Sequence, residues 1–130
     1  MSIKTLIVED DFMSRKVMLA YMSPLGECDI AANGSEAIEA FMMAHAAGNP
    51  YHLIALDIMM PEMSGQEVLR RIRQVETDQG LAAVKIVMTT ALDDAKNIMD
   101  AFKNQCEGYL VKPIMYETLM EMLRDLKLLG

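Results

Sequence analysis

The chain has 130 residues, of which 52% are hydrophobic and 24% are charged, and its formal net charge is -7. This length is typical of one domain and the apolar content supplies a full core, so the composition excludes an intrinsically disordered chain. The acidic charge argues against nucleic-acid binding, which draws on clustered Lys and Arg, and we expect protein partners instead.

The chain contains two cysteines, Cys28 and Cys106. Two isolated cysteines are too few for a disulfide framework or a metal site, so we expect reduced thiols, which are typical of the cytoplasm. The sequence does not open with the pattern of a signal peptide, and no apolar run approaches the ~18 residues of a membrane span. We therefore expect a cytoplasmic protein that does not contact a membrane.

The hydrophobic pattern alternates between strand and helix along the whole chain. Strands are expected at residues 3–8, 28–32, 52–56, 84–88 and 108–111. Helices are expected at residues 12–25, between 35 and 48, and at 64–75, 93–106 and 115–128. Five repeats of strand and helix predict an α/β domain with a parallel sheet that right-handed crossovers cover on both faces.

Four of the expected strands end at residues that can handle a phosphoryl group. The residues that follow these strands are Glu9 with Asp10 and Asp11, then Asp57, then Thr89 with Thr90, and finally Lys112. In an open parallel sheet the carboxyl ends of the strands share one edge, and ligands bind in the crevice outside it. We therefore expect three carboxylates, a hydroxyl and an ammonium to meet at one place.

The carboxylates predict a magnesium site. Clustering Asp10, Asp11 and Asp57 costs energy unless a cation binds there. Mg²⁺ takes hard oxygen ligands and often bridges to a phosphate, whereas zinc prefers softer ligands. An acidic pair after a strand is by itself more often a solvated loop, but its combination with Asp57 and Lys112 favours the metal site.

Lys112 directly precedes Pro113. A flexible ammonium at a strand end can reach a phosphate as a point charge. The peptide bond before a proline can be cis at modest cost, which would aim the lysine inward. A Lys-Pro pair or a threonine at a strand end is ordinary when it occurs alone, so it is the combination that indicates phosphate chemistry.

The chain resembles a response-regulator receiver domain of the CheY-like superfamily over essentially all of its length. The matching motifs, in family order and spacing, are the acidic pair Asp10-Asp11, the D-x-x-M-P-x-x-x-G segment from Asp57 to Gly65, Thr90-Ala91, and the aromatic-x-x-Lys-Pro segment from Tyr109 to Pro113. The resemblance implies one receiver domain, residues 1–130, with a doubly wound five-stranded parallel sheet of order 2-1-3-4-5 and five helices.

The resemblance also implies roles at the acidic end of the site. Asp57 would accept a phosphoryl group from a phosphohistidine. Asp11, Asp57 and the carbonyl of Met59 would bind Mg²⁺ directly, and Asp10 would act through a water molecule. Met59 and Leu92 would shield the phosphoryl group from water, so we expect slow autodephosphorylation.

The remaining roles concern phosphate contact and switching. Lys112 would pair with the phosphoryl oxygens, and Thr90 with the Ala91 amide would hydrogen-bond them. Inward movement of Thr90 would let Tyr109 rotate inward, which links the site to the surface of the fourth helix, fifth strand and fifth helix. One departure from the family is Gln105, which stands where a left-handed glycine is common and costs roughly 1 kcal/mol there unless the helix ends at Asn104.

Together these features favour a single-domain response regulator, because no linker or output domain follows the last expected helix. Its partners would be a histidine kinase or a histidine phosphotransfer protein upstream and an unidentified protein downstream.

A phosphorelay intermediate is an alternative. A Mg²⁺-dependent phosphohydrolase of the haloacid dehalogenase type would want an acid two residues after the nucleophile, where this chain has Met59. A phosphate-independent interaction module would normally have lost part of the acidic set or the lysine.

Overall fold

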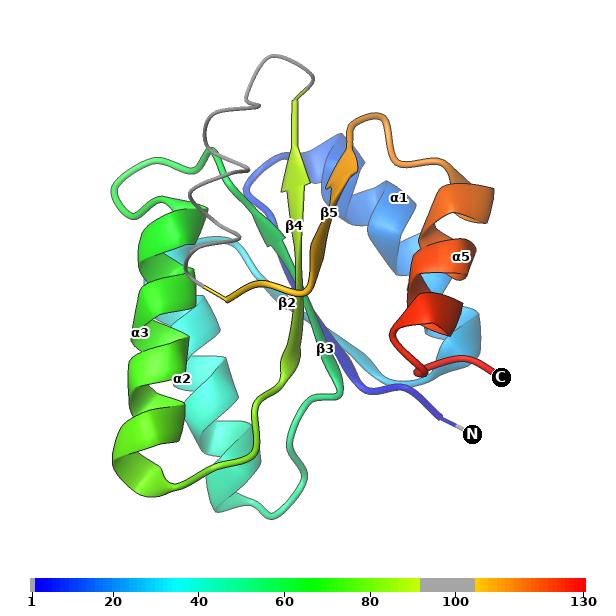
Figure 1. Ribbon diagram of the computed structural model, residues 1–130. Helices are drawn as coiled ribbons and strands as arrows, with labels where there is room; N and C mark the ends of the chain where they lie inside the picture. Colours follow the sequence, from blue (N-terminus) through cyan, green and yellow to red (C-terminus); the bar gives the residue numbers. More distant parts are fainter. Residues whose placement is uncertain (1, 92–104) are drawn as a thin grey trace.

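The structure, a computed structural model, describes residues 2–91 and 105–130 (Figure 1). The strands are β1 (Thr5–Val8), β2 (Cys28–Ala31), β3 (Leu53–Asp57), β4 (Lys85–Thr90) and β5 (Gly108–Val111). The helices within these residues are α1 (Phe12–Met22), α2 (Gly34–Ala46), α3 (Gly65–Gln79), α5 (Tyr116–Asp125) and a short 3-10 helix, η1 (Ser23–Leu25). The helix expected at 93–106 lies outside the described residues except for its last two positions, which are not helical.

The strands form one parallel sheet in the order β2-β1-β3-β4-β5. The central strand β3 pairs with β1 on one side and with β4 on the other. The predicted doubly wound α/β fold and its strand order are therefore confirmed. In this topology the direction of winding changes between β1 and β3, and the crevice outside the carboxyl ends of these strands is where such folds bind ligands.

Helices cover both faces of the sheet: α2 and α3 lie on one face and α1 and α5 on the other (Figure 1). Successive side chains of a strand point to opposite faces. In β1, Leu6 and Val8 pack into the core under α2 and α3, whereas Ile7 packs into the core under α1 and α5. Burial on both faces explains why β1, β3 and β4 contain continuous apolar runs.

Local signals fix where the helices begin and end. The side chains that cap the first turns of α1, α2 and α3 are those of Asp11, Asn33 and Ser64. α1 ends at Met22, three residues before the expected end, and passes into the 3-10 turn of η1. α3 runs to Gln79, beyond the expected end at residue 75, because the first left-handed residue after it is Gly80, with φ of 65°. None of the described helices is long and apolar enough to cross a membrane.

The turn before β5 contains the departure from the family pattern. Gln105 has a φ of 73°, the left-handed conformation that favours glycine. Its carbonyl oxygen accepts hydrogen bonds from Nε and Nη2 of Arg73 at 3.1 and 2.9 Å. Arg73 also pairs with Glu107 at 2.9 Å, so a side chain from α3 and that of the residue before β5 hold this turn in place.

Candidate phosphoryl-acceptor and metal site

The polar strand ends lie together at one edge of the sheet. Register between β3, β4 and β5 brings Asp57, Thr90 and Lys112 to this edge. The Lys112 amide donates to the Thr90 carbonyl at 2.7 Å, which continues the ladder one residue beyond β5. β1 pairs with β3 up to Val8, so the acids that follow Val8 reach the same edge. The topology therefore produces the convergence that the sequence predicts.

Glu9, Asp10 and Asp57 form the acidic group of this site. Each offers a carboxylate oxygen, and these oxygens lie within 4.8 Å of one another. Glu9 and Asp57 are buried and Asp10 is exposed. Two buried carboxylates beside a third repel one another unless a cation or a proton compensates them, and hard oxygen donors suit Mg²⁺. The donor set thus fits the expected metal, with Glu9 as a member that the sequence interpretation missed.

Asp11 is not part of this acidic group, so its role as a direct metal ligand stays a prediction that the grouping does not support. Its Oδ2 accepts a hydrogen bond from the Ser14 amide at 2.8 Å and caps α1. Hydrogen bonds from Ser14 lower the pKa of the Asp11 carboxyl, which is exposed to solvent. An aspartate directly before the first residue of an amphipathic helix is a common N-cap signal. If Asp11 is assigned as this N-cap from the sequence, the acidic pair of the site becomes Glu9 and Asp10 instead of Asp10 and Asp11.

Lys112 is held between two acids. Its Nζ lies 2.7 Å from Glu9 Oε1 and 3.4 Å from Asp57 Oδ1. Burial alone would lower the pKa of Lys112, but the Glu9 and Asp57 carboxylates outweigh burial and raise it. The ammonium is therefore charged and already beside the expected phosphoacceptor. The peptide bond between Lys112 and Pro113 is cis.

The Asp57 carboxyl is strongly perturbed. Burial and the neighbouring Glu9 carboxyl raise the pKa of Asp57 to about 7, and Lys112 opposes this rise. Only 5% of the Asp57 side chain is exposed. A buried carboxylate next to an ammonium, at a pKa near neutrality, is a common signature of a functional site.

The loop after β3 wraps closely around Asp57. The Met59 amide donates to Asp57 Oδ1 at 3.3 Å, and the Gly65 amide donates to the Ile58 carbonyl at 2.9 Å. A Cβ atom on Gly65 would collide with the Asp57 carbonyl oxygen. This contact gives the physical reason for glycine at the end of the D-x-x-M-P-x-x-x-G segment. The Met59 side chain is 60% exposed.

Of the expected switch residues, Thr90 ends β4 at this edge, and Tyr109 lies further back on the neighbouring strand β5. Thr90 is fully buried, and its hydroxyl donates to the Ala91 carbonyl at 3.1 Å. Ala91 is exposed beside it, and Tyr109 is 39% exposed on β5. Leu92, which was expected to shield the phosphoryl group, lies outside the described residues. The roles of Thr90, Ala91 and Tyr109 as phosphate contacts and switch stay predictions.

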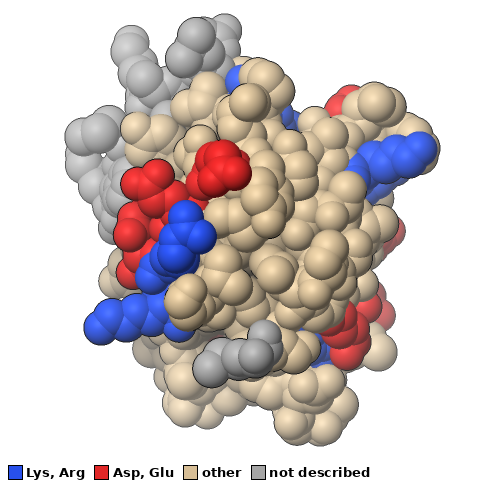
Figure 2. All heavy atoms as spheres, turned by 90° about the vertical axis from the view of Figure 1, so that its right-hand side faces the viewer, with Lys and Arg blue, Asp and Glu red and all other residues tan. Residues whose placement is uncertain are grey.

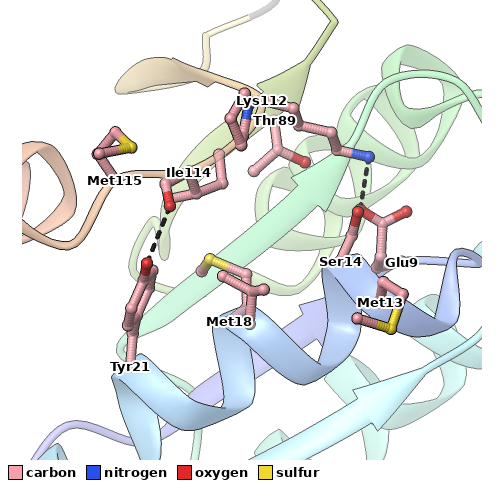
Figure 3. A pocket seen from close by; sticks show the side chains of 11 residues that line it. Glu9, Met13, Ser14, Met18, Tyr21, Thr89, Lys112, Ile114 and Met115 are labelled. Carbon is pink, nitrogen blue, oxygen red and sulfur yellow. Dashed lines mark hydrogen bonds and ion pairs between the residues drawn. The ribbon is translucent and has the colours of Figure 1, made fainter.

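A cavity of about 350 Å³ opens beside the Glu9–Lys112 pair. Its lining from α1 and the segment after β5 is mainly apolar (Figure 3) and comprises Met13, Val17, Met18, Tyr21, Pro113, Ile114 and Met115. The Tyr21 hydroxyl donates to the Ile114 carbonyl at 3.1 Å and ties the two walls together. Figure 2 shows that the face formed by α1 and α5 is mostly uncharged, with acidic and basic side chains gathered toward its edges.

The comparisons with known sequences agree with this geometry. A family model described as the response regulator receiver domain matches residues 5–124. Regulatory protein VanRB from Enterococcus faecalis is 35% identical over 122 residues, which are 93% of this chain and 50% of that protein. The chain spans about half the length of the curated relatives it matches.

Solved structures show the same fold. The receiver domain of the histidine kinase CKI1 from Arabidopsis thaliana, complexed with Mg²⁺ and BeF₃⁻, is 26% identical with a TM-score of 0.83, and the match covers 96% of this chain and 89% of that one. A chain in the co-crystal structure of the Saccharomyces cerevisiae histidine phosphotransfer protein Ypd1 with the receiver domain of its downstream response regulator Ssk1 is 27% identical with a TM-score of 0.80. That match covers 94% of this chain and 87% of the other.

Proposed function

Because the chain belongs to the response regulator receiver domain family of two-component signalling, we propose that it is a phosphorylation switch whose acceptor is Asp57. The donor would be a phosphohistidine on a histidine kinase or a histidine phosphotransfer protein. The observation that carries the proposal is the buried Asp57 carboxylate, which shares one site with Glu9, Asp10 and the Lys112 ammonium. Receiver domains are signalling proteins rather than enzymes with turnover, and this chain would catalyse only its own phosphorylation and dephosphorylation.

The residues that would hold Mg²⁺ are Asp10 and Asp57, with Glu9 beside them. These three acids, rather than Asp11, offer grouped carboxylate oxygens. The Met59 carbonyl stays a proposed further ligand, since Met59 lies in the loop that follows Asp57 and its amide donates to Asp57 Oδ1. When bound, Mg²⁺ would neutralise the acids and let a phosphoryl group approach.

The chemistry would be nucleophilic transfer. A carboxylate oxygen of Asp57 attacks phosphorus, the bond from phosphorus to the imidazole nitrogen breaks, and the imidazole departs with the bonding pair. Lys112 lies 3.4 Å from Asp57 Oδ1 and would stabilise the charge that spreads over the phosphoryl oxygens. The Thr90 hydroxyl and the Ala91 amide would donate hydrogen bonds to the same oxygens.

The output would follow from Thr90 and Tyr109. In the structure Thr90 bonds to the Ala91 carbonyl, and a phosphoryl group would draw its hydroxyl away. Tyr109 would then turn from its exposed position toward the space behind Thr90. The partner downstream would be a protein that reads the surface around β5 and α5. The acidic net charge favours a protein over nucleic acid, and this choice stays a prediction.

The upstream partner and the domain organisation are part of the proposal. Ypd1 is described as a histidine phosphotransfer protein that binds the receiver domain of Ssk1, which supports a donor of that class. The same site would serve a phosphorelay intermediate that passes the group onward. A phosphohydrolase of the haloacid dehalogenase type is disfavoured, since an apolar Met59 stands where the second acid would be needed. We propose that residues 1–130 form one receiver domain and that this domain acts in the cytoplasm.

Labelling with a small phosphodonor tests the acceptor. With acetyl phosphate and Mg²⁺, the wild-type chain should gain one phosphoryl group in intact-mass spectra, and peptide mapping should place it on Asp57. Asp57→Asn should abolish the gain, while the control Asp11→Asn, which removes an acid of the cap, should retain it. Labelling that persists in Asp57→Asn on another residue would refute the assignment.

A further inference from the structure

The apolar part of the cavity beside α1 takes no part in the proposed phosphoryl transfer. The whole cavity measures about 350 Å³, and Asp57 does not line it. One wall is a face of α1, on which Ser14, Met18 and Tyr21 follow one another about one helical turn apart. The other wall is the segment from Pro113 to Met115, directly after β5. The cavity thus lies between two elements that are far apart in the sequence.

Two contacts of Tyr21 hold these walls in place. Its hydroxyl donates to the Ile114 carbonyl at 3.1 Å, and its ring meets the Tyr116 ring edge-on, with the ring centroids 5.5 Å apart. Figure 3 shows this hydrogen bond at one end of the cavity and the Glu9–Lys112 contact at the other. The walls cannot close on each other without breaking these contacts, so the space is formed before a ligand enters, as is usual for small-molecule sites.

The chemistry of the lining selects a neutral and mainly apolar molecule. The walls offer thioether, aliphatic and ring carbons, and the two charged groups, Glu9 and Lys112, neutralise each other at 2.7 Å. An ionic ligand would lose its water without gaining a free counter-charge. Ser14 and Thr89 add hydroxyl groups to the lining, so one uncharged polar group of a ligand can be hydrogen-bonded.

Size and access narrow the class of ligand further. An apolar cavity of about 150 Å³ holds benzene, so this larger space has room for two rings. Met13 and Met115 line the cavity and are 63% and 62% exposed, which places them where it meets solvent. Methionine side chains are flexible and polarisable, so they can move aside for a ligand and then pack against an aromatic ring.

We propose that this cavity is a binding site for a small neutral aromatic molecule of two rings that carries a hydroxyl group at the Ser14 end. The site is separate from the phosphoryl acceptor, so it does not depend on phosphorylation of Asp57. A suitable probe is 2-naphthol, which has two fused rings and one hydroxyl and is uncharged at neutral pH.

NMR spectra of the whole chain with isotope-labelled methionine methyl groups locate the binding of 2-naphthol, without Mg²⁺ or a phosphodonor. The signals of Met13, Met18 and Met115 should shift together and saturate at submillimolar 2-naphthol. Met43 is as exposed as Met13 but lies on α2, and its signal should stay in place. Shifts that do not saturate, or that centre on methionines outside the cavity, would overturn the inference.

Calorimetry with ligands that differ only in their polar group tests the chemistry of the site. The anion 2-naphthoate and the cation 2-naphthylmethylammonium should each bind at least about tenfold more weakly than 2-naphthol. Ser14→Ala should weaken 2-naphthol about fivefold and leave naphthalene unchanged. An anion or cation that binds as tightly as 2-naphthol would refute the neutral class. Failure of all these molecules to bind would leave the cavity to a side chain of a protein partner and would also overturn the inference.

A variant that fills the cavity completes the test. Val17 lines the α1 wall and is half-buried, so Val17→Trp should fold and abolish the 2-naphthol shifts, while Met43→Trp should keep them. If circular dichroism shows that Val17→Trp is unfolded, Met13→Trp at the exposed mouth takes its place. Retained binding in the folded variant would count against the site. Asp57→Asn should bind 2-naphthol as the wild type does, so this site and the phosphorylation switch can fail separately.

Discussion

The raised pKa of Asp57 makes the stability of the metal-free protein depend on pH in a direction unusual for an aspartate. The pKa rises from 3.8 to about 7 in the folded state, so the folded protein binds a proton at Asp57 between these values when the unfolded chain does not. The free energy of unfolding therefore falls as pH rises through this window and levels off above it. Asp57→Asn should remove this fall in the free energy of unfolding, because a neutral amide resembles the protonated carboxyl.

The magnitude follows from the two pKa values. A pKa change from 3.8 to about 7 corresponds to about 4 kcal/mol at most. Water near the carboxylate and screening reduce this value, and we expect about 2 kcal/mol. Relative to wild type, Asp57→Asn should be near neutral at low pH and more stable by about 2 kcal/mol at pH 8.

Urea unfolding followed by far-UV circular dichroism in the presence of a chelator measures this difference. Mg²⁺ at ten times its Kd should then raise the stability of wild type at pH 8 by about 1.4 kcal/mol and leave Asp57→Asn nearly unchanged. As a control, the stability of Asp11→Asn relative to wild type should not increase with pH. Asn can also cap α1, and the lowered pKa of Asp11 leaves that carboxylate charged throughout this range. A difference between wild type and Asp57→Asn that stays flat or falls from pH 5 to 8 would refute the reasoning.

Two further predictions concern a buried hydroxyl and the phosphate lifetime. The Thr5 hydroxyl is buried with no hydrogen-bond partner among the described residues. Thr5→Val should therefore raise the free energy of unfolding, measured in urea, by about 1 kcal/mol. The control Thr77→Val loses a hydrogen bond to the Arg73 carbonyl and should not raise it. Met59→Asn should speed loss of phosphate about tenfold after donor removal, about 1.4 kcal/mol in the barrier, because an amide can orient the attacking water. Met43→Asn, an equally exposed methionine on α2, should leave the lifetime unchanged, and equal lifetimes in all three proteins would contradict the shielding role of Met59.

The fold was predictable because its signals are repeated and local. The strands β1, β3 and β4 contain continuous apolar runs, as expected for a sheet buried on both faces, and side chains such as Asn33 cap the starts of α1, α2 and α3. The strand order followed from the family resemblance. The end of α3 was misplaced by four residues, since polar residues after 75 continue the helix until Gly80 stops it.

The location of the candidate site was also predictable, but the identity of its members was not. Topology alone sends every strand end to one edge, so Asp57, Thr90 and Lys112 could be grouped without coordinates. Which carboxylate of a run of acids faces inward depends on where the strand ends and the helix begins. The end of β1 at Val8 and the start of α1 at Phe12 match the expected bounds, but the sequence interpretation overlooked that Asp11 caps α1 and that Glu9 belongs to the acidic group.

Three adjacent acids after β1 therefore occupy three different environments. The Glu9 amide donates to the Ala31 carbonyl at 3.1 Å, so Glu9 still lies on the ladder with β2 and its side chain enters the core edge beside Lys112. Asp10 follows in the turn and is exposed, and Asp11 already accepts the first bond of α1. Charge alone makes the three equivalent in a sequence. Their contacts make Glu9 the partner of the lysine and Asp11 a helix cap, while Asp10 faces solvent. Exchanging Glu9 with either aspartate would therefore alter the site even though the net charge stayed at -7.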